Sequence, residues 1–158
     1  MKLNKFGPIG ALCTASLFGG TSVLAGDTAN VAVSASVTGT CKFNSGGAIS
    51  FTLDPTSTVA AAGTISSSPA FWCTKGTPYT VSGGDGANSV TVGIRRMKHA
   101  TLAEFIPYTF TGTTATGTGA GKTSPIPLTL SAAAVANIDF INASAGNYAD
   151  TVVVTISP

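Results

Sequence analysis

The stretch that decides the fold reads Asp150-Thr151-Val152-Val153-Val154-Thr155-Ile156-Ser157, and only Pro158 follows it. Thr and Val favour the pleated sheet, and the two-residue period of an extended chain puts Val152, Val154 and Ile156 on one face. This alternation predicts a β-strand with one buried face.

The same period recurs along the rest of the chain. Gly-rich stretches such as 83–86 separate the alternating runs, as turns separate strands. Only Ser131–Asn137, which is short and rich in Ala, looks helical. The pattern indicates an all-β chain of about eight or nine strands, for which a sandwich is favoured over a barrel. The expected strands lie at 31–37, 49–53, 70–74, 79–81, 90–94, 106–110, 126–130 and 150–157.

Residues 1–25 have the pattern of a secretory signal peptide. Lys2 and Lys5 precede an apolar stretch that ends in Val23-Leu24-Ala25, so we expect cleavage after Ala25. A membrane anchor is the alternative, but the apolar run is short for a bilayer and is interrupted by glycines.

Processing changes the composition of the product. Removing 25 of the 158 residues leaves 133, and the loss of two lysines leaves six basic residues against six acidic ones. Only 9% of the chain is charged. A neutral, sparsely charged domain lacks the concentrated basic face that nucleic-acid binding needs, and it is not a disordered polyelectrolyte. We expect no membrane insertion of the mature chain, since nothing after residue 26 could span a bilayer.

Processing also makes the cysteine count even. Cys13 leaves with the signal segment, and Cys41 and Cys73 remain. Export to an oxidising compartment makes a Cys41–Cys73 disulfide the expected state, with two free buried thiols as the alternative. Closing a loop of about 33 residues would stabilise the fold by roughly 3.7 kcal/mol in the chain-entropy model.

Catalytic and cofactor motifs are mostly absent, so we expect no enzyme, no metal and no cofactor. The segment 117–125 misses the phosphate-loop spacing by one residue, and Pro125 prevents a helix from starting there. No G-x-S-x-G elbow accompanies His99, and the carboxylates are scattered rather than clustered as metal ligands. A secreted hydrolase remains the alternative class.

Two further features have competing interpretations. His99 forms a basic cluster with Arg95, Arg96 and Lys98. A solvated strand end is favoured over a contact with an acidic surface. For Trp72, a core position packed beside the disulfide is favoured over a sugar-stacking platform.

Several motifs in sequence order resemble the spore coat protein U family, which includes the pilin subunits of archaic chaperone–usher pili. The resemblance covers essentially the whole mature chain, and the ending together with the cysteine placement is its most specific part. The motifs are Val37-Thr38-Gly39-Thr40-Cys41, Phe71-Trp72-Cys73-Thr74-Lys75-Gly76, Arg96-Met97, Pro107-Tyr108-Thr109-Phe110 and Gly146-Asn147-Tyr148-Ala149-Asp150-Thr151-Val152-Val153-Val154-Thr155-Ile156.

The resemblance implies an incomplete immunoglobulin-like β-sandwich that is completed by donor-strand exchange. The N-terminal segment of one subunit fills the gap in the next, a periplasmic chaperone lends a strand beforehand, and an outer-membrane usher exports the fibre. The chain would then divide into a signal peptide at 1–25, a donor-strand segment at 26–38 and a pilin domain at 39–158.

The residues themselves fit a donor strand. The segment from Thr28 to Cys41 is uncharged, and strand addition needs alternate side chains that fill pockets. We expect Val31, Val33, Ala35 and Val37 to form the inserting face, and Val152, Val154 and Ile156 to line the groove and contact the chaperone. The alternative is that 30–38 is an ordinary first strand of its own sandwich.

The expected function is that of a structural subunit of a secreted surface fibre, with a role in adhesion or biofilm formation. Its expected partners are identical or related pilin subunits, the chaperone and the usher. A spore or cyst coat protein of the same family and a minor tip adhesin are the alternatives.

Overall fold

The computed structural model describes residues 26–158, so the expected signal peptide lies outside the described residues. The chain divides after Ala35 into two units. Residues 26–40 contain no strand or helix, and the side chains of Val31, Val33 and Val37 are 84%, 89% and 83% exposed. The segment 30–38 is therefore not the first strand of its own sandwich, as the alternative interpretation had it.

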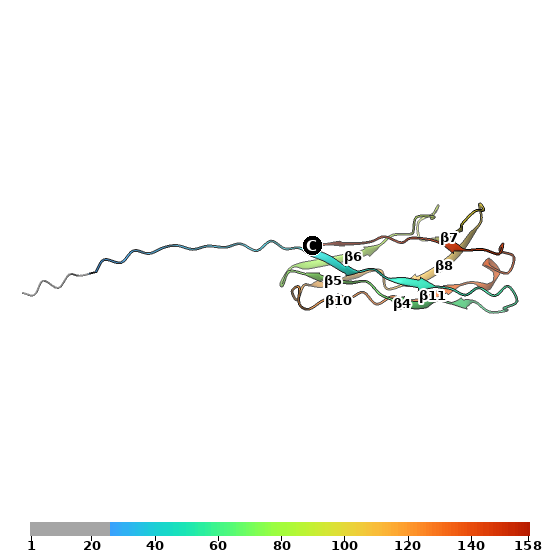
Figure 1. Ribbon diagram of the computed structural model, residues 1–158, viewed down its shortest axis with the longest axis horizontal. Coiled ribbons are helices and arrows are strands. Elements are labelled where there is room, and N and C mark those ends of the chain that lie inside the picture. Colours follow the sequence, from blue (N-terminus) through green and yellow to red (C-terminus); the bar gives the residue numbers. More distant parts are fainter. Residues whose placement is uncertain (1–25) are drawn as a thin grey trace, which may run out of the picture. The chain divides into compact units, whose positions relative to one another are not determined.

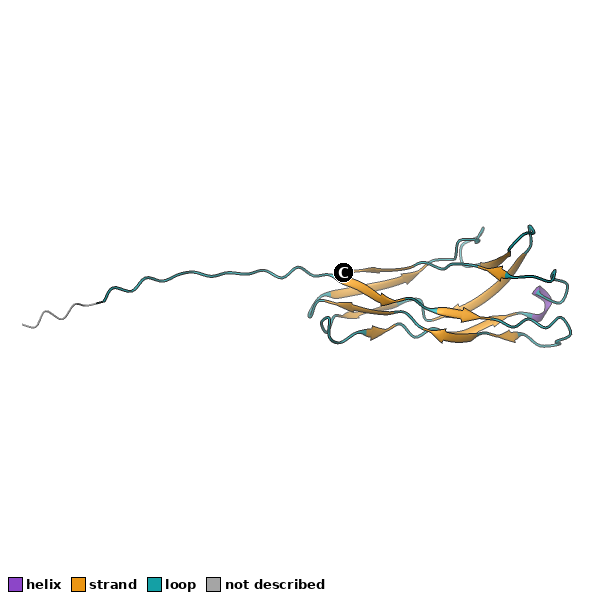
Figure 2. Cartoon of the chain, in the orientation of Figure 1, coloured by secondary structure: helices purple, strands orange, loops and turns teal. Residues whose placement is uncertain are grey.

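The part of the chain from Ser36 onward is an all-β, antiparallel sandwich with one short 3-10 helix, η1 (Asn137–Asp139). Figure 2 shows η1 at the end of this unit opposite to the C-terminus. The end near the C-terminus consists of two three-stranded sheets. One has the order β1 (Cys41–Ser45), β5 (Ala70–Cys73), β10 (Ile126–Pro127), and the other β13 (Val154–Ser157), β6 (Pro78–Gly83), β9 (Ala115–Thr118).

The other end of the sandwich consists of a five-stranded sheet and a two-stranded sheet. The five-stranded order is β12 (Tyr148–Ala149), β7 (Arg95–His99), β8 (Phe105–Thr111), β11 (Ser131–Val135), β3 (Ala61–Ala62), and the pair is β2 (Ala48–Ser50), β4 (Thr64–Ser67). Figure 1 labels β7, β8 and β11, which are consecutive in the five-stranded sheet, together with β4 of the two-stranded sheet.

Two core clusters fill these two ends. The first contains Phe71, Cys73, Val81 and Leu128, and it lies between the three-stranded sheets. The second lies on the five-stranded sheet, where Ile49, Phe51 and Leu53 from the chain around β2 pack against it. Its buried members are Met97, Ile106, Tyr108, Phe110, Leu130, Ala133, Val135 and Phe140.

The predicted disulfide is confirmed. Cys41 and Cys73 are directly opposite each other in the β1–β5 ladder, and their sulfurs are 2.02 Å apart. The expected strand at 106–110 is confirmed as well, because Ile106, Tyr108 and Phe110 alternate toward the core along β8.

The prediction of a helix at Ser131–Asn137 is wrong. Most of this segment forms β11, which pairs with β8 on one side and β3 on the other and buries Ala133 and Val135. Helix propensity differs by less than about 1 kcal/mol between most residue types, so hydrogen bonds to two neighbouring strands outweigh the preference of Ala.

The prediction of a strand at 90–94 is also wrong. The segment is a turn in which Ile94 N–H donates to Thr91 O at 3.0 Å, and Gly93 has a φ of 86°. That positive φ interrupts an extended chain and is favourable only for glycine. Val90 and Val92 consequently lie on the surface, 76% and 91% exposed.

The prediction that Trp72 packs in the core beside the disulfide is wrong too. Its neighbours Phe71 and Cys73 are fully buried, so the alternation of β5 turns Trp72 to the outer face, where it is half-buried.

Candidate functional site

The second core cluster is open along one edge of the sandwich, and this opening is the candidate site. One wall is the chain from Gly47 to Phe51, which includes β2, and the other is the chain from Tyr148 to Val154. The groove between them encloses about 290 Å³. A second hollow of about 570 Å³ continues it toward Leu53 and Phe140.

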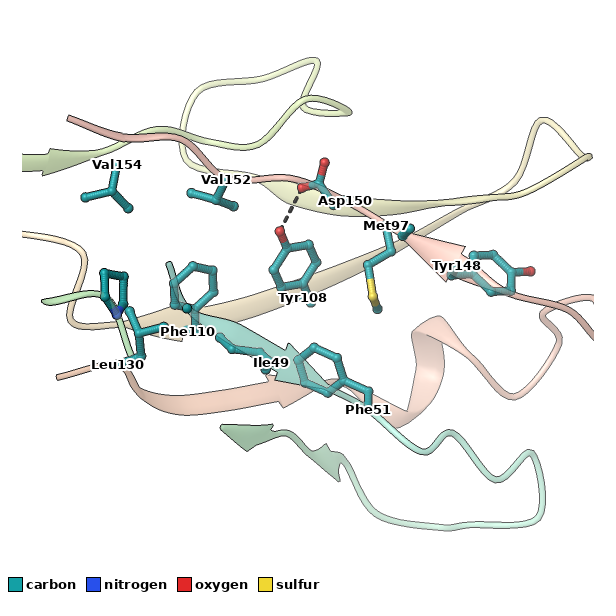
Figure 3. A pocket seen from close by; sticks show the side chains of 13 residues that line it. Ile49, Phe51, Met97, Tyr108, Phe110, Leu130, Tyr148, Asp150, Val152 and Val154 are labelled. Atoms are coloured by element: carbon teal, nitrogen blue, oxygen red, sulfur yellow. Dashed lines mark hydrogen bonds between the residues drawn. The ribbon is translucent and has the colours of Figure 1, made fainter. Parts of the chain in front are cut away.

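Most of the side chains that line the groove are apolar, and the exceptions are Asp150 and the hydroxyl groups of Tyr108 and Tyr148. Figure 3 shows Val152 and Val154 on the upper wall, Ile49 and Phe51 on the lower wall, and the ring of Phe110 between them. Tyr108 and Met97 form the floor, and the sulfur of Met97 points toward the lower wall. An apolar channel of this kind exposes hydrophobic surface that a complete sandwich would bury.

Both walls end in unpaired strand edges. Among the described residues, β13 pairs only with β6, and β2 pairs only with β4. Gly84 N–H donates to Val153 O at 2.9 Å, so Val153 directs its backbone groups toward β6. Backbone groups alternate sides along a strand, so those of Val152 and Val154 face the groove. An extended chain placed there would find backbone hydrogen-bond partners.

One charged side chain lies in the groove wall. Asp150 Oδ2 accepts a 2.7 Å hydrogen bond from the Tyr108 hydroxyl, and Oδ1 accepts bonds from the backbone and side-chain nitrogens of Asn88 at 3.1 and 3.0 Å. Burial, followed by the bond to Asp150, raises the pKa of Tyr108 far above its ordinary value. Both groups are therefore held in place, with the charge of Asp150 satisfied.

Tyr148 is positioned at the continuation of the groove by Glu104. The Tyr148 hydroxyl donates to Glu104 Oε2 at 2.7 Å, and Ser144 Oγ donates to Oε1 at 2.8 Å. These hydrogen bonds hold the pKa of Glu104 below its ordinary value, with the Tyr148 bond as the largest cause.

The basic cluster at 95–99 is not a solvated strand end, contrary to the favoured interpretation. His99 is buried, and its Nδ1 accepts hydrogen bonds from the backbone of Thr101 and Leu102. Arg95 lies 4.4 Å above the Phe110 ring centroid and Arg96 4.3 Å above that of Phe105. Their guanidinium groups also donate to backbone carbonyls, so of this cluster only Lys98 is exposed.

Only some of the residues that the sequence predicts for the groove line it in the structure. Val152 and Val154 line the groove, whereas Ile156 does not and packs, as Val154 also does, against the first core cluster. The predicted donor residues Val31, Val33, Ala35 and Val37 are all exposed. The sequence interpretation missed the opposite wall, Ile49 and Phe51, although the alternation at 49–53 marked it as a half-buried strand.

Within residues 26–158, no group of three or more potential ligands could hold a metal ion, and no helix is long and apolar enough to cross a bilayer.

Comparison with protein families identifies the chain. The family model of the Spore Coat Protein U domain matches residues 27–155. No curated protein matches the chain. The family match spans nearly all of the described residues and confirms the resemblance drawn from the motifs. The chain therefore belongs to the Spore Coat Protein U domain family.

Proposed function

We propose that this Spore Coat Protein U domain chain is a structural subunit of a surface fibre, which polymerises by inserting its N-terminal segment into the groove of the next subunit. The observation that supports this most directly is that one chain contains both a groove and a segment that could fill it. An apolar groove lies between unpaired strand edges, and an exposed segment alternates apolar and small polar residues without a single charge from 28 to 41.

The lengths of the two features agree. The upper wall from Tyr148 to Val154 and the donor face from Val31 to Val37 each span about seven residues, or roughly 20 Å of extended chain. Each Val that the groove buries would contribute roughly 1.5–3 kcal/mol. A charge at the same place would cost several kcal/mol, which accounts for the uncharged sequence of the segment.

The backbone supports the same proposal. Strand addition draws affinity from main-chain hydrogen bonds, and Val152 and Val154 turn theirs to the groove. The donor segment and the groove are different surfaces of the subunit. A contact of this head-to-tail kind that does not close on itself produces a filament.

The open groove also accounts for the proposed partners. An exposed apolar channel with free strand edges is prone to aggregation until it is covered. In the proposed route the signal peptide at 1–25 directs export, a periplasmic chaperone covers the groove of the domain at 39–158, and an outer-membrane usher releases the subunit as its neighbour donates the segment at 26–38. The finished fibre lies at the cell surface and serves adhesion or biofilm formation.

A peptide complementation experiment tests the proposal. The mature chain is mixed with a synthetic peptide of residues 30–38, and thermal unfolding is followed by circular dichroism. A ligand of the native state raises the midpoint with its concentration, so we expect a concentration-dependent increase. The matched peptide carries Val33→Asp and should leave the midpoint unchanged. Equal effects of the two peptides, or no effect of either, would reject the groove as a strand acceptor.

The name of the family supports a second candidate, a coat protein. Electron microscopy of producing cells separates the two, because fibres extend from the surface and a coat forms a continuous layer.

A further inference from the structure

We propose that the outer face of the β1–β5 ladder binds an acidic polysaccharide through Trp72 and three lysines, Lys42, Lys75 and Lys122. We call these four residues the Trp72 site. It lies on the face of β5 that is turned away from the core, and none of its residues lines the groove.

The backbone presents Trp72 at the surface. Phe71 and Cys73 anchor β5 in the core, and the ring between them is half-buried, so it is held by its neighbours yet accessible. Lys42 is directly opposite Trp72 in the β1–β5 ladder. Side chains of directly opposite residues lie on the same face, so the exposed Lys42 borders the ring on one side.

The loop before β10 provides the other side of the site. The ammonium group of Lys122 lies 5.9 Å from the centroid of the Trp72 ring, within cation–π range. This loop is tied to the turn after β5 because Gly121 N–H donates to Cys73 O at 3.0 Å and Gly76 N–H donates to Gly119 O at 2.9 Å. Lys75 lies in that turn, and its side chain starts next to Gly121.

The charge carried by the segments that form the site is of one sign. All three lysines are exposed, and they are half of the basic residues after position 25. The segments that carry them, 41–45, 70–76 and 119–127, contain no Asp or Glu. Elsewhere the arginines of β7 donate to backbone carbonyls and cover aromatic rings. Three of the four exposed lysines among the described residues therefore belong to the Trp72 site, and the fourth is Lys98 on β7.

An acidic polysaccharide matches both the indole ring and the lysines of the Trp72 site. The electron-rich face of an indole ring attracts the C–H groups on the flat side of a sugar ring. Ammonium groups around it pair with the carboxylates or sulfates that repeat along the polymer. An acidic peptide would use the lysines and leave the indole without a flat apolar partner. A nucleic acid requires a more basic surface than a domain with equal numbers of acidic and basic residues provides.

The Trp72 site would bind more strongly in the proposed fibre, a consequence that rests on the proposed function. Because the Trp72 site and the groove share no residue, every subunit of a filament would present a copy, and a long polysaccharide would bind many copies with high avidity.

The chain contains a built-in probe for the test, since Trp72 is its only tryptophan. Mature monomers are titrated with alginate, which carries uronate carboxylates, and with heparin, which carries sulfates, while intrinsic fluorescence is recorded. We expect a saturable change with at least one of them, and the responding polymer identifies the anion. Raising NaCl from about 50 mM to about 300 mM should weaken the response, because salt screens exposed charges. Neutral dextran, polyglutamate and single-stranded DNA should give little change.

Variants connect the response to the site. Lys42→Ala and Lys122→Ala should each raise the half-saturation concentration about fivefold, roughly the effect of losing one exposed charge contact. Lys98→Ala removes the same charge from an exposed position on β7 and serves as the matched control. Trp72→Ala should abolish binding of fluorescein-labelled polymer measured by anisotropy, and an unchanged urea midpoint shows that the variant is folded.

The proposal is overturned if polyglutamate or DNA reproduces the response, if dextran binds as well as the acidic polymers, or if Lys98→Ala is as damaging as Lys122→Ala. Absence of any fluorescence change with both acidic polymers also overturns it. These results are independent of polymerisation, because monomers are titrated. A failure of strand exchange would leave monomer binding intact.

Discussion

The hydroxyl of Tyr108 donates a 2.7 Å hydrogen bond to Asp150 Oδ2, and this bond joins β8 inside the five-stranded sheet to the wall of the groove. The same carboxylate accepts two bonds from Asn88, in the loop after β6. Three segments that are distant in sequence thus meet at Asp150, immediately before the strand edge that faces the groove. The wall is therefore held in position while the groove is open.

Removal of this bond should destabilise the domain. Tyr108→Phe leaves a charged acceptor short of one partner, so we expect the free energy of unfolding to fall by about 1–3 kcal/mol in urea denaturation of the mature chain. Tyr79→Phe is the matched control, because among the described residues the Tyr79 hydroxyl makes no hydrogen bond, and it should change stability by less than about 0.5 kcal/mol. Equal effects of the two variants would contradict the importance of the Asp150 contact.

Alkaline pH should weaken the same contact. Burial and the bond to Asp150 raise the pKa of Tyr108 in the folded state, so its contribution is complete below the unfolded pKa of about 10 and is lost as the pH rises from there toward the folded pKa. The stability difference between the wild type and Tyr108→Phe should therefore shrink above about pH 10. Urea midpoints of both proteins across the alkaline range measure this, and a constant difference would contradict it.

Acidic pH should remove the stabilising contribution of Glu104, whereas alkaline pH removes that of Tyr108. Hydrogen bonds from Tyr148 and Ser144 lower its folded pKa, so its contribution is present above the ordinary carboxyl pKa and is lost as the pH falls through the folded value. Glu104→Gln should lower the melting temperature at about pH 7 and make little difference at about pH 2. Melting curves at the two pH values provide the test. The expectation fails if the variant is equally destabilised at both.

The disulfide should contribute substantially to stability. Replacing Cys41 and Cys73 together by Ser should lower the free energy of unfolding by roughly 3.7 kcal/mol, since the open chain gains conformational entropy when unfolded. Urea denaturation compares the variant with the oxidised wild type. Reduced wild type is the control and should resemble the double variant.

A charge on the donor face should stop polymerisation without affecting folding. Val33→Asp places a carboxylate where the apolar groove of the next subunit would bury it, at a cost of several kcal/mol. Ser34→Asp adds the same charge on the alternate face and should still polymerise. Electron microscopy of purified protein measures the number and length of the fibres, and sedimentation measures the polymerised fraction. Fibres of normal length from Val33→Asp would reject the assigned inserting face.

Much of the strand pattern of this protein follows from the local alternation and composition of its sequence. The period of two found β8 and the face of Val152 and Val154, because the side a strand residue faces depends only on its position along the strand. The expected removal of residues 1–25 would leave Cys41 and Cys73 as the two cysteines, and these two are joined in the structure. The alternating segment at 28–41 could also be recognised from its sequence, because it has no charged residue. The family could be recognised from its motifs.

Tertiary contacts decided the rest. The Ala-rich segment became β11 because β8 and β3 offer it hydrogen bonds from both sides, which no local preference encodes. Trp72 came to lie outside because Phe71 and Cys73 took the core face of β5. The groove depends on which edges stay unpaired, and its walls bring together residues such as Ile49 and Val152 that are about 100 positions apart in the sequence. A sequence shows which residues can face a core, but only the folded chain shows where that core remains open.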